Sequence, residues 1–272
     1  MSITALTPWY GSNRLHAAKV GELLRGCEWV GVPFAGSMCE LNYITARTML
    51  VNDLHEEQMN LAMTVISEDN GPRLIRMLRR TPFHESIHQI AKAQLKSKDD
   101  IVFGKLISAY HYFIACWMSR NGSAGTDREF DASFSYRRDA AGGDSNRRFR
   151  NATEALLEWR KIMQRCTFVV RDAFDFLKKE CLDRPKHGIY CDPPFPDGGD
   201  KYKHKFTCEQ HKRLAESLGE FHKTKVVVRY YDHQLVRDLY TTDKWDWIEF
   251  EGRKQTNGKA PEVLIVNKVG AA

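Results

Sequence analysis

The sequence predicts a doubly wound α/β domain that carries an insertion. In residues 29–53 a strand, a glycine-containing turn, a helix and a second strand follow one another, which is the order of a nucleotide-binding βαβ unit. The strand and helix pattern resumes after residue 166, and residues 54–165 differ from it in character. The length of 272 residues is enough for one large domain with such an insertion.

The first part of the domain is predicted from apolar spacing and from breaks at glycine. Apolar residues recur at helical intervals up to Leu24, and the pattern stops near Gly26. The segment Pro33-Phe34-Ala35-Gly36-Ser37 predicts a tight turn, and the strand after it ends at Asn52-Asp53. The expected elements, in chain order, are a helix over 14–24, a strand over 29–32, a turn over 33–37, a helix over 39–46 and a strand over 49–51.

The insertion is expected to be helical first and irregular later. Residues 54–118 have mainly helical patterns, in which Phe113 and Trp117 are expected in the core. Residues 119–150 are rich in Gly, Ser, Asp and Arg with interleaved aromatic residues, which predicts a loop or hairpin excursion. A helix over 151–165 is expected to end the insertion.

The α/β pattern then returns. The expected elements are strands over 167–170 and 188–191, a helix over 207–218, a strand over 225–229, a helix over 235–240 and strands over 245–251 and 262–267. Thr207 is a plausible N-cap for its helix. The last two strands are expected to close the sheet as an antiparallel pair.

Composition limits the classes of partner. The net charge of +6 and the pI of about 8.9 suit a polyanionic partner. The seven cysteines are scattered without a C-x-x-C pair, so neither a zinc site nor a disulfide framework is expected. The expected location is the reducing cytoplasm. No secretory signal and no apolar run of membrane-spanning length is found. His84, His88 and His111 lack the spacing of a metal site and are expected on helix surfaces, so no metal is predicted.

The sharpest chemical signal is Asp192-Pro193-Pro194-Phe195. It follows a predicted strand, where doubly wound sheets have their active sites. The prolines remove backbone donors and leave acceptors, namely the Asp192 carboxylate and the neighbouring carbonyls. Two such acceptors can hold both hydrogens of an amine on an aromatic ring, which frees its lone pair to attack a methyl sulfonium. Phe195 offers a face on which a base can stack.

Six other segments accompany this motif. They are Pro8-Trp9-Tyr10-Gly11-Ser12-Asn13-Arg14, Pro33-Phe34-Ala35-Gly36-Ser37, Asn52-Asp53, Arg171-Asp172-Ala173, the run of Tyr202, His204, Phe206, Thr207 and His211, and Pro261-Glu262-Val263-Leu264-Ile265-Val266-Asn267. In this order they resemble the motifs of the DNA adenine methyltransferase (Dam-like) family, especially its short phage and prophage forms. The resemblance covers nearly the whole chain.

The resemblance implies a Rossmann-like domain that binds S-adenosylmethionine and methylates the N6 amine of a flipped adenine in duplex DNA. It implies catalytic roles for Asp192, Pro193, Pro194 and Phe195. Cofactor contacts are implied for Trp9, Tyr10, Gly11, Asn13, Pro33, Phe34, Ala35, Gly36, Ser37, Asp53, Asp172, Ala173 and Asp192. The family usually has Lys at position 13, an acid at position 32 and often Gly at position 38, where this chain has Asn13, Val32 and Met38.

The resemblance also implies the domain limits and the DNA contacts. Residues 1–58 and 166–272 would form the catalytic domain, and residues 59–165 the inserted target-recognition domain. Arginine can contact phosphates or read guanine edges, and aromatic residues can fill the space that a flipped base leaves. The expected DNA-binding residues are Arg76, Arg79, Arg137, Arg138, Arg147, Arg148, Lys201, Lys203 and His204.

Three alternatives stay open. The same chemistry on the exocyclic amine of cytosine is the nearest alternative, because the Asp-Pro-Pro-Phe motif is compatible with it. A DNA-binding relative with a decayed active site is favoured by the departures at Asn13, Val32 and Met38. A methyltransferase acting on RNA or on a small molecule is the third. A monomer is expected, because one active site and one recognition insertion suffice.

Overall fold

The computed structural model describes residues 5–97, 105–120, 123–136, 143–196, 201–250 and 261–269. The chain divides into two compact units, each assembled from segments that are separated in the sequence. The first unit comprises Met1–Leu15, Gly36–Asn42 and His55–Val170, and the second comprises His16–Ala35, Tyr43–Leu54 and Arg171–Ala272. The domain limits expected from the sequence stay a prediction.

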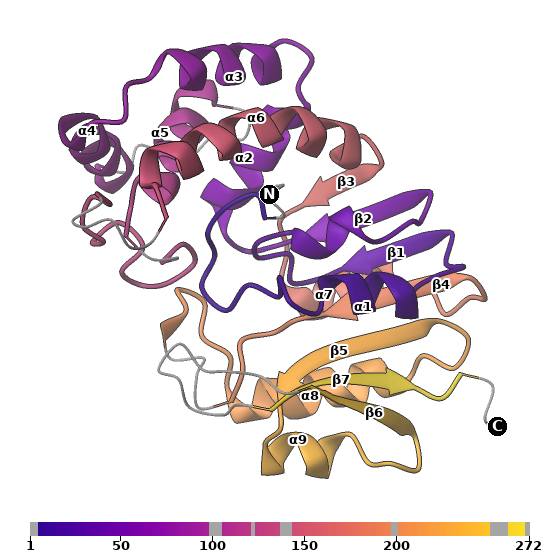
Figure 1. Ribbon diagram of the computed structural model, residues 1–272. Helices are drawn as coiled ribbons and strands as arrows, with labels where there is room; N and C mark the ends of the chain where they lie inside the picture. Colours follow the sequence, from indigo (N-terminus) through magenta and orange to yellow (C-terminus); the bar gives the residue numbers. More distant parts are fainter. Residues whose placement is uncertain are drawn as a thin grey trace. The chain divides into compact units, whose positions relative to one another are not determined.

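The second unit is built on a twisted sheet (Figure 1). Its strands are β1 (Trp29–Val32), β2 (Thr48–Asn52), β4 (His187–Cys191), β5 (Lys225–Tyr231), β6 (Trp245–Phe250) and β7 (Glu262–Asn267), in the order β2-β1-β4-β5-β7-β6. The first four in this order run parallel, and β7 is antiparallel to both β5 and β6. This confirms the predicted α/β class and the predicted closing pair, although Glu251 lies outside the described residues.

The strand order reverses between β1 and β4. From β1 the chain continues to β2 on one side of it and later to β4 on the other side. Open α/β sheets bind their ligands at the carboxyl ends of the strands at such a reversal. Pro33 follows β1 and Asp192 follows β4, so both predicted motifs begin at this point of the sheet.

Helices cover both faces of this sheet, which explains its apolar strands. Figure 1 shows α1 (Ala17–Leu23) in front of the strands and α7 (Ala173–Glu180) and α8 (Cys208–Gly219) behind them; α9 (Gln234–Leu239) precedes β6. The three consecutive valines of β5 are completely buried, as expected for a parallel strand covered on both sides. Thr207 caps α8 through a capping box with Gln210, so its predicted role is confirmed.

The first unit is mainly helical. It contains α2 (Glu56–Ile66), α3 (Asn70–Arg80), α4 (Glu85–Lys96), α5 (Leu106–Trp117) and α6 (Ser145–Met163), together with η1 (Cys39–Asn42) and β3 (Cys166–Val169). α5 contacts each of the other four helices, and both Phe113 and Trp117 are buried in it, as predicted. Among the helices of the described ranges, none combines the length and apolar character that a membrane span needs.

Three predicted helices have different bounds. The helix expected over 39–46 is a single 3₁₀ turn, at the end of which the Asn42 side chain donates to the Cys39 carbonyl, and residues 43–47 form no helix. α1 begins at Ala17 instead of Arg14. α6 begins six residues before the expected Asn151, because the Asp144 side chain accepts from the backbone N–H of Asn146.

The histidines of the insertion are not all at the surface. His84 is an exposed N-cap of α4, whose side chain accepts from Ser86 N. His88, which was expected on the helix surface, is buried, and its Nε2 lies 2.9 Å from Ser119 Oγ. The expectation is therefore wrong for His88. Its place on α4 puts it on the same face as Ala91 and Leu95, which are buried too.

Candidate active site

Asp192 leaves the sheet at the carboxyl end of β4, and its carboxylate is held by an arginine of the neighbouring strand. Arg229 of β5 donates through Nη1 to Asp192 Oδ2 at 2.9 Å and to Oδ1 at 3.3 Å. The Arg229 side chain is only 4% exposed, whereas the Asp192 side chain is 18% exposed. The carboxylate is thus anchored from inside the protein and still reaches solvent.

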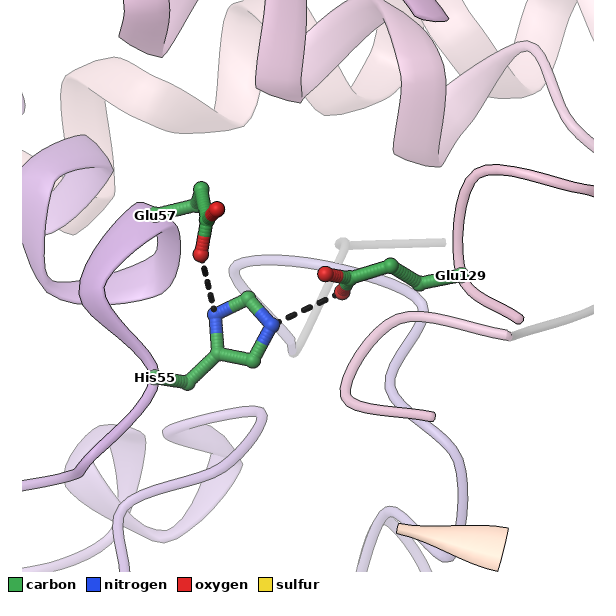
Figure 2. A group of neighbouring side chains, drawn as sticks. All are labelled: His55, Glu57 and Glu129. Atoms are coloured by element: carbon green, nitrogen blue, oxygen red, sulfur yellow. Dashed lines mark hydrogen bonds and ion pairs between the residues drawn. The ribbon is translucent and has the colours of Figure 1, made fainter. Parts of the chain in front are cut away.

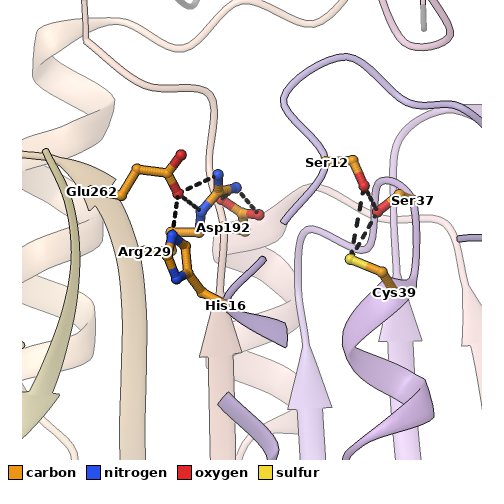
Figure 3. Close-up of polar contacts among 7 residues, drawn as sticks. All are labelled: Ser12, His16, Ser37, Cys39, Asp192, Arg229 and Glu262. Carbon is orange, nitrogen blue, oxygen red and sulfur yellow. Dashed lines mark hydrogen bonds and ion pairs between the residues drawn. The ribbon is translucent and has the colours of Figure 1, made fainter. Parts of the chain in front are cut away.

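A second acid holds the same arginine from the other side (Figure 3). Arg229 Nε and Nη2 donate to Glu262 Oε2 at 3.0 and 2.7 Å. His16 Nε2 lies 3.4 Å from that same Glu262 oxygen. Asp192, Arg229, Glu262 and His16 therefore form one chain of contacts, called here the Arg229 chain.

Burial and charge act in opposite directions within the Arg229 chain. Burial raises the pKa of the Asp192 carboxyl, Arg229 opposes this shift and Glu262 adds to it. Burial alone would lower the pKa of Arg229, but the Asp192 and Glu262 carboxylates outweigh it and raise that pKa. Burial lowers the pKa of His16, against the attraction of Glu262, so His16 is neutral at pH 7. The one cation of this chain therefore lies between its two acids.

Phe195, the last residue of the predicted catalytic motif, packs into an aromatic group. Its ring meets Tyr231 edge-on at a centroid distance of 4.5 Å and lies 5.8 Å from Tyr230. The Arg229 guanidinium carbon lies 5.1 Å from the ring centroid. Only 9% of Phe195 is exposed, so stacking on a base would use a small remaining part of the ring. That role stays a prediction.

One buried side chain ties together three segments that contain predicted cofactor residues. Asn52 donates through Nδ2 to the carbonyls of Pro33 and Arg171, both at 3.0 Å, and its Oδ1 accepts from Arg171 N at 2.8 Å. The backbone N–H of Ala35 donates to the Asn52 carbonyl at 3.0 Å. The turn after β1, the end of β2 and the start of the segment before α7 thus meet at Asn52.

The acids next to this junction have the chemistry that an adenosine needs. Asp53 is half-buried directly after Asn52, and Asp172 is exposed directly after Arg171. Asp172 caps α7, where one carboxylate oxygen, Oδ1, accepts from both Phe174 N and Asp175 N. Ribose hydroxyls and an adenine amine are donors, and carboxylates are acceptors. The residues present therefore fit an adenosine-containing cofactor.

The aromatic residues of two predicted motifs pack against each other. Phe34 lies edge-on to Phe206 at 5.7 Å, and Phe206 is stacked with Phe174 at 6.1 Å. Phe206 also meets His211, whose Nδ1 lies 2.8 Å from Tyr230 Oη. The run that follows the catalytic motif therefore supports the cofactor turn from within the second unit.

In the first unit, Trp9 of the N-terminal motif lies between two glycines in the left-handed region. A Cβ on Gly36, where φ is +45°, would lie 3.1 Å from Trp9 Nε1. A Cβ on Gly125, where φ is +82°, would lie 2.3 Å from Trp9 Cζ2. Tyr10 N donates to the Ala124 carbonyl at 3.1 Å. Both glycines are thus required by conformation and by the close approach of the indole.

This tryptophan contacts a buried histidine, His55, which Figure 2 shows with its two glutamate neighbours. His55 Nε2 lies 2.7 Å from Glu129 Oε2, and His55 Nδ1 accepts from Gln58 N at 3.2 Å and lies 3.4 Å from Glu57 Oε2. The Trp9 and His55 rings meet edge-on at 5.1 Å. His55, Glu57 and Glu129 are metal-ligating residue types within reach of one another. In Figure 2 each of the two imidazole nitrogens faces one of the two carboxylates.

The rest of the predicted cofactor turn belongs to a small polar cluster. Gln58 donates to the Gly36 carbonyl at 2.7 Å. Figure 3 shows Ser12 Oγ donating to Ser37 Oγ at 2.9 Å, with Cys39 Sγ beside both. Burial raises the pKa of the Cys39 thiol, so it stays protonated. Met38 is buried with φ at +60°, which is the backbone conformation that favours the family's glycine.

Residues 11–255 match the D12 class N6 adenine-specific DNA methyltransferases. The chain belongs to this family. The predicted family is confirmed by this match, and both the predicted kind of enzyme, a DNA adenine methyltransferase, and the predicted cofactor, S-adenosylmethionine, agree with it.

The comparison with solved structures gives a match to SMU.472, described as a candidate methyltransferase complexed with SAH. The TM-score is 0.32 at 8% sequence identity, and the comparison covers 78% of this chain and 56% of that chain. The chain thus spans little more than half the length of this structure. No curated protein matches the chain in sequence.

The residues expected to bind DNA have different surroundings. Arg76 and Arg147 are exposed, and Arg79 is exposed and paired with Glu154. Arg148 is half-buried and donates to the Ser119 carbonyl at 3.1 Å. Lys201 and His204 are exposed and Lys203 is half-buried, whereas Arg137 and Arg138 lie outside the described residues. Direct contact with DNA stays a prediction for all of them.

The sequence analysis missed Arg229, Glu262 and Asn52 as site residues. Arg229 follows three valines in a predicted strand, and a charged residue in a strand buried on both faces needs an oppositely charged partner. That signal was available. The identity of the partner was not, because Glu262 is 33 residues further on and meets Arg229 only through the pairing of β5 with β7.

Proposed function

We propose that this D12 class methyltransferase transfers a methyl group from S-adenosylmethionine to the N6 amine of an adenine flipped out of duplex DNA. The observation that carries the proposal is the Asp192 carboxylate, anchored by Arg229 and partly open to solvent at the strand reversal. That position, directly after β4, is where a doubly wound sheet presents its catalytic residues.

Within the second unit, the cofactor would be held by the residues around Asn52. When bound, S-adenosylmethionine supplies an electrophilic methyl group on its sulfonium. Asp53 would accept from the ribose hydroxyls and Asp172 from the adenine amine, because both acids flank the junction at Asn52. Cofactor contacts of the N-terminal motif, like those of Gly36 and Ser37, stay predictions.

The target amine would be held by acceptors only. Asp192 accepts one N–H of the amine, and the Pro193 carbonyl accepts the other. Both contacts draw the nitrogen lone pair out of conjugation with the ring, which makes the nitrogen a better nucleophile. Phe195 packs beside the base. Catalysis then rests mainly on proximity and on fixed electrostatics.

The base must leave the duplex before it can react, because its amine is otherwise paired and stacked. Flipping costs a few kcal/mol, which stacking and hydrogen bonds in the pocket offset. The proposed target-recognition domain, residues 59–165, would hold the duplex through exposed cations such as Arg76 and Arg147. These phosphate contacts predict that DNA binding weakens as salt increases.

The test is transfer from labelled S-adenosylmethionine to unmethylated duplex DNA, followed by digestion to nucleosides. The wild-type protein is expected to give N6-methyladenine. Asp192→Ala is expected to lower the transfer rate by on the order of 1,000-fold or more, because the amine loses its acceptor, while DNA binding persists. Asp243→Asn, an exposed turn acid of the second unit, serves as the matched control and is expected to keep the wild-type rate.

Each outcome has a defined reading. Methylated cytosine instead of methylated adenine would replace the proposed base with its N4-amine alternative. Transfer to RNA but not to DNA would replace the proposed polymer. Near wild-type turnover by Asp192→Ala would refute the mechanism. No transfer, together with no cofactor binding in calorimetry, would favour a decayed DNA-binding relative.

A further inference from the structure

The proposed reaction needs the Asp192 carboxylate in one orientation, and the Arg229 chain supplies a means of fixing it. We propose that Arg229 is a positioning residue for methyl transfer, which holds Asp192 so that one carboxylate oxygen faces the amine, and that Glu262 in turn holds Arg229. This inference rests on the proposed function. It adds two residues that the Asp-Pro-Pro-Phe motif does not contain.

The Arg229 guanidinium contacts the two acids through different nitrogens. Nε and Nη2 donate to Glu262 Oε2, and Nη1 donates to Asp192. The Nη1 contact favours Oδ2, at 2.9 Å, over Oδ1, at 3.3 Å. A carboxylate has about four lone-pair sites, so an oxygen engaged this loosely keeps acceptor capacity for an amine. The guanidinium orients the carboxylate and does not saturate it.

The planar fork of arginine is needed for this arrangement. The double contact with Glu262 fixes the plane of the guanidinium, and the plane fixes the direction in which Nη1 points. Lysine has one ammonium on a flexible stem and cannot impose a direction on two partners at once. The strand pairing also contributes, because Arg229 lies opposite Leu264, two residues from Glu262 along β7. This diagonal lets the side chains meet on one face of the sheet.

The electrostatics of the Arg229 chain point the same way. The groups that act on Asp192 are Arg229 from β5, Glu262 from β7 and Tyr190 from β4. His16, which precedes α1, faces Glu262 and Arg229 and is neutral at pH 7. Without Arg229, the Asp192 and Glu262 carboxylates would remain with no arginine between them, and Asp192 would hold a proton more readily. A protonated carboxyl is a poorer acceptor for the amine.

A purely structural ion pair would make a different prediction. Breaking a buried pair destabilises a protein whether or not the pair serves catalysis. A loss of activity in an Arg229 variant is therefore not sufficient. The informative quantities are the single-turnover rate in folded protein, the affinities for cofactor and DNA, and the pH at which the rate begins to fall on the acid side.

The experiment compares full-length wild type with Arg229→Met, Arg229→Lys and Glu262→Gln. Arg237→Met is the matched control, because Arg237 is also paired with two acids, Asp232 and Glu249, but does not contact Asp192. Each protein is checked for folding by circular dichroism and for cofactor and DNA affinity by calorimetry. Single-turnover methyl transfer is then measured from acid to neutral pH.

Arg229→Met is expected to slow single-turnover transfer by about 100-fold with both affinities within a few-fold of wild type. Arg229→Lys is expected to be faster than Arg229→Met but slower than wild type. Arg237→Met is expected to keep the wild-type rate. Removing the cation raises the pKa of Asp192, so the acid limb of Arg229→Met moves to higher pH. Removing the negative charge of Glu262 lowers the pKa of Asp192, so the acid limb of Glu262→Gln moves to lower pH.

Opposite movement of the two acid limbs is the result that a structural role would not produce. Folded Arg229→Met with a near wild-type rate would overturn the inference, and so would a rate loss fully explained by weaker cofactor binding. If Arg229→Met does not fold, Arg229→Lys and Glu262→Gln decide, since a wild-type rate in Arg229→Lys together with an unmoved acid limb in Glu262→Gln would also overturn it. Wild-type protein without transfer would refute the proposed function and this inference together, whereas active wild type with unaffected variants would refute the inference alone.

Discussion

Each unit of the molecule contains a buried histidine beside a glutamate, and the two groups end differently. In the first unit, His55 stands between Glu57 and Glu129, and all three side chains are 5% exposed or less (Figure 2). In the second unit, the Arg229 chain begins at His16 and ends at Asp192, whose side chain is 18% exposed (Figure 3). The first group is buried throughout, whereas the second reaches solvent at Asp192 of the catalytic motif.

The difference shows how similar residue types take different roles. Glu129 uses the same oxygen to accept from His55 and from the backbone N–H of Gly125, so the first group joins a helix start to a loop. In the Arg229 chain, Asp192 is held by Arg229, and its side chain remains 18% exposed. A fully satisfied buried group mainly specifies structure, whereas a partly exposed acid anchored from inside is suited to hold a substrate.

The largest effect that we expect is a loss in the free energy of unfolding at acid pH. A buried histidine in each unit contributes to it. Burial lowers the pKa of His88, in the first unit, and of His211, in the second, to about 4. In the unfolded chain each histidine titrates near 6.5, so between these values the unfolded state binds more protons and stability falls as the pH falls. Each histidine is expected to contribute up to roughly 3 kcal/mol to this loss.

The measurement is the free energy of unfolding from urea titrations between pH 7.5 and pH 4. His88→Asn and His211→Asn are each expected to flatten the pH dependence, and His84→Asn, at an exposed position, is expected to leave it unchanged. If His88→Asn or His211→Asn keeps the wild-type dependence of the free energy of unfolding on pH, that histidine does not cause the loss of stability in acid.

The next largest effect tests the first group. Glu129→Ala removes the acceptor of two buried donors, His55 Nε2 and Gly125 N. The expected loss is about 3 kcal/mol in the free energy of unfolding, because both donors stay buried without a partner. Urea unfolding followed by circular dichroism measures it. Glu56→Ala, at an exposed position of α2, is the control and is expected to change stability by less than about 0.5 kcal/mol.

This result also sharpens the contrast with the Arg229 chain. If the first group is structural, the Glu129→Ala protein that folds should lose methyl transfer on the acid side at the same pH as wild type. A shifted acid limb in Glu129→Ala would mean that the two groups are not as different as their exposures indicate.

The smallest effect concerns the helix that carries His211. Thr207→Ala removes the hydroxyl that accepts from Gln210 N and breaks the capping box of α8. A loss of about 1 kcal/mol in the free energy of unfolding is expected. Thr207→Ser keeps the hydroxyl and should therefore keep most of the stability that the cap contributes. Equal losses in both variants would show that the methyl group of Thr207, and not its cap, stabilises the helix.

The sheet was predictable because its signals are local. The apolar runs that became β1, β4 and β5 each stand between polar turns, and a strand covered on both faces has that pattern. Thr207 was predicted as a cap for the same reason, since an N-cap and its helix are neighbours in the sequence. His88 was misplaced because histidine suits both surface and core. Its spacing from Ala91 and Leu95 was the signal that it faces inward.

The catalytic motif was also predictable from the sequence, but its support was not. Asp192 is conspicuous between a strand and two prolines. Its contact with Arg229 depends on which strands are neighbours and on their register, and neither follows from residue spacing. Met38 was noted as a departure from a usual glycine. The structure adds that it keeps the left-handed conformation, which costs about 1–2 kcal/mol for a residue with a side chain.

Asn52 has a consequence for anyone who wishes to redesign this enzyme. Its one amide group joins three stretches of chain that are far apart in the sequence, through Pro33 and Arg171 and through its own strand. The geometry of the turn after β1 is therefore set from outside the turn. Loops from other members of the family can be grafted between residues 33 and 37 as chimeras, provided that position 52 is kept constant and that the loop keeps Gly36.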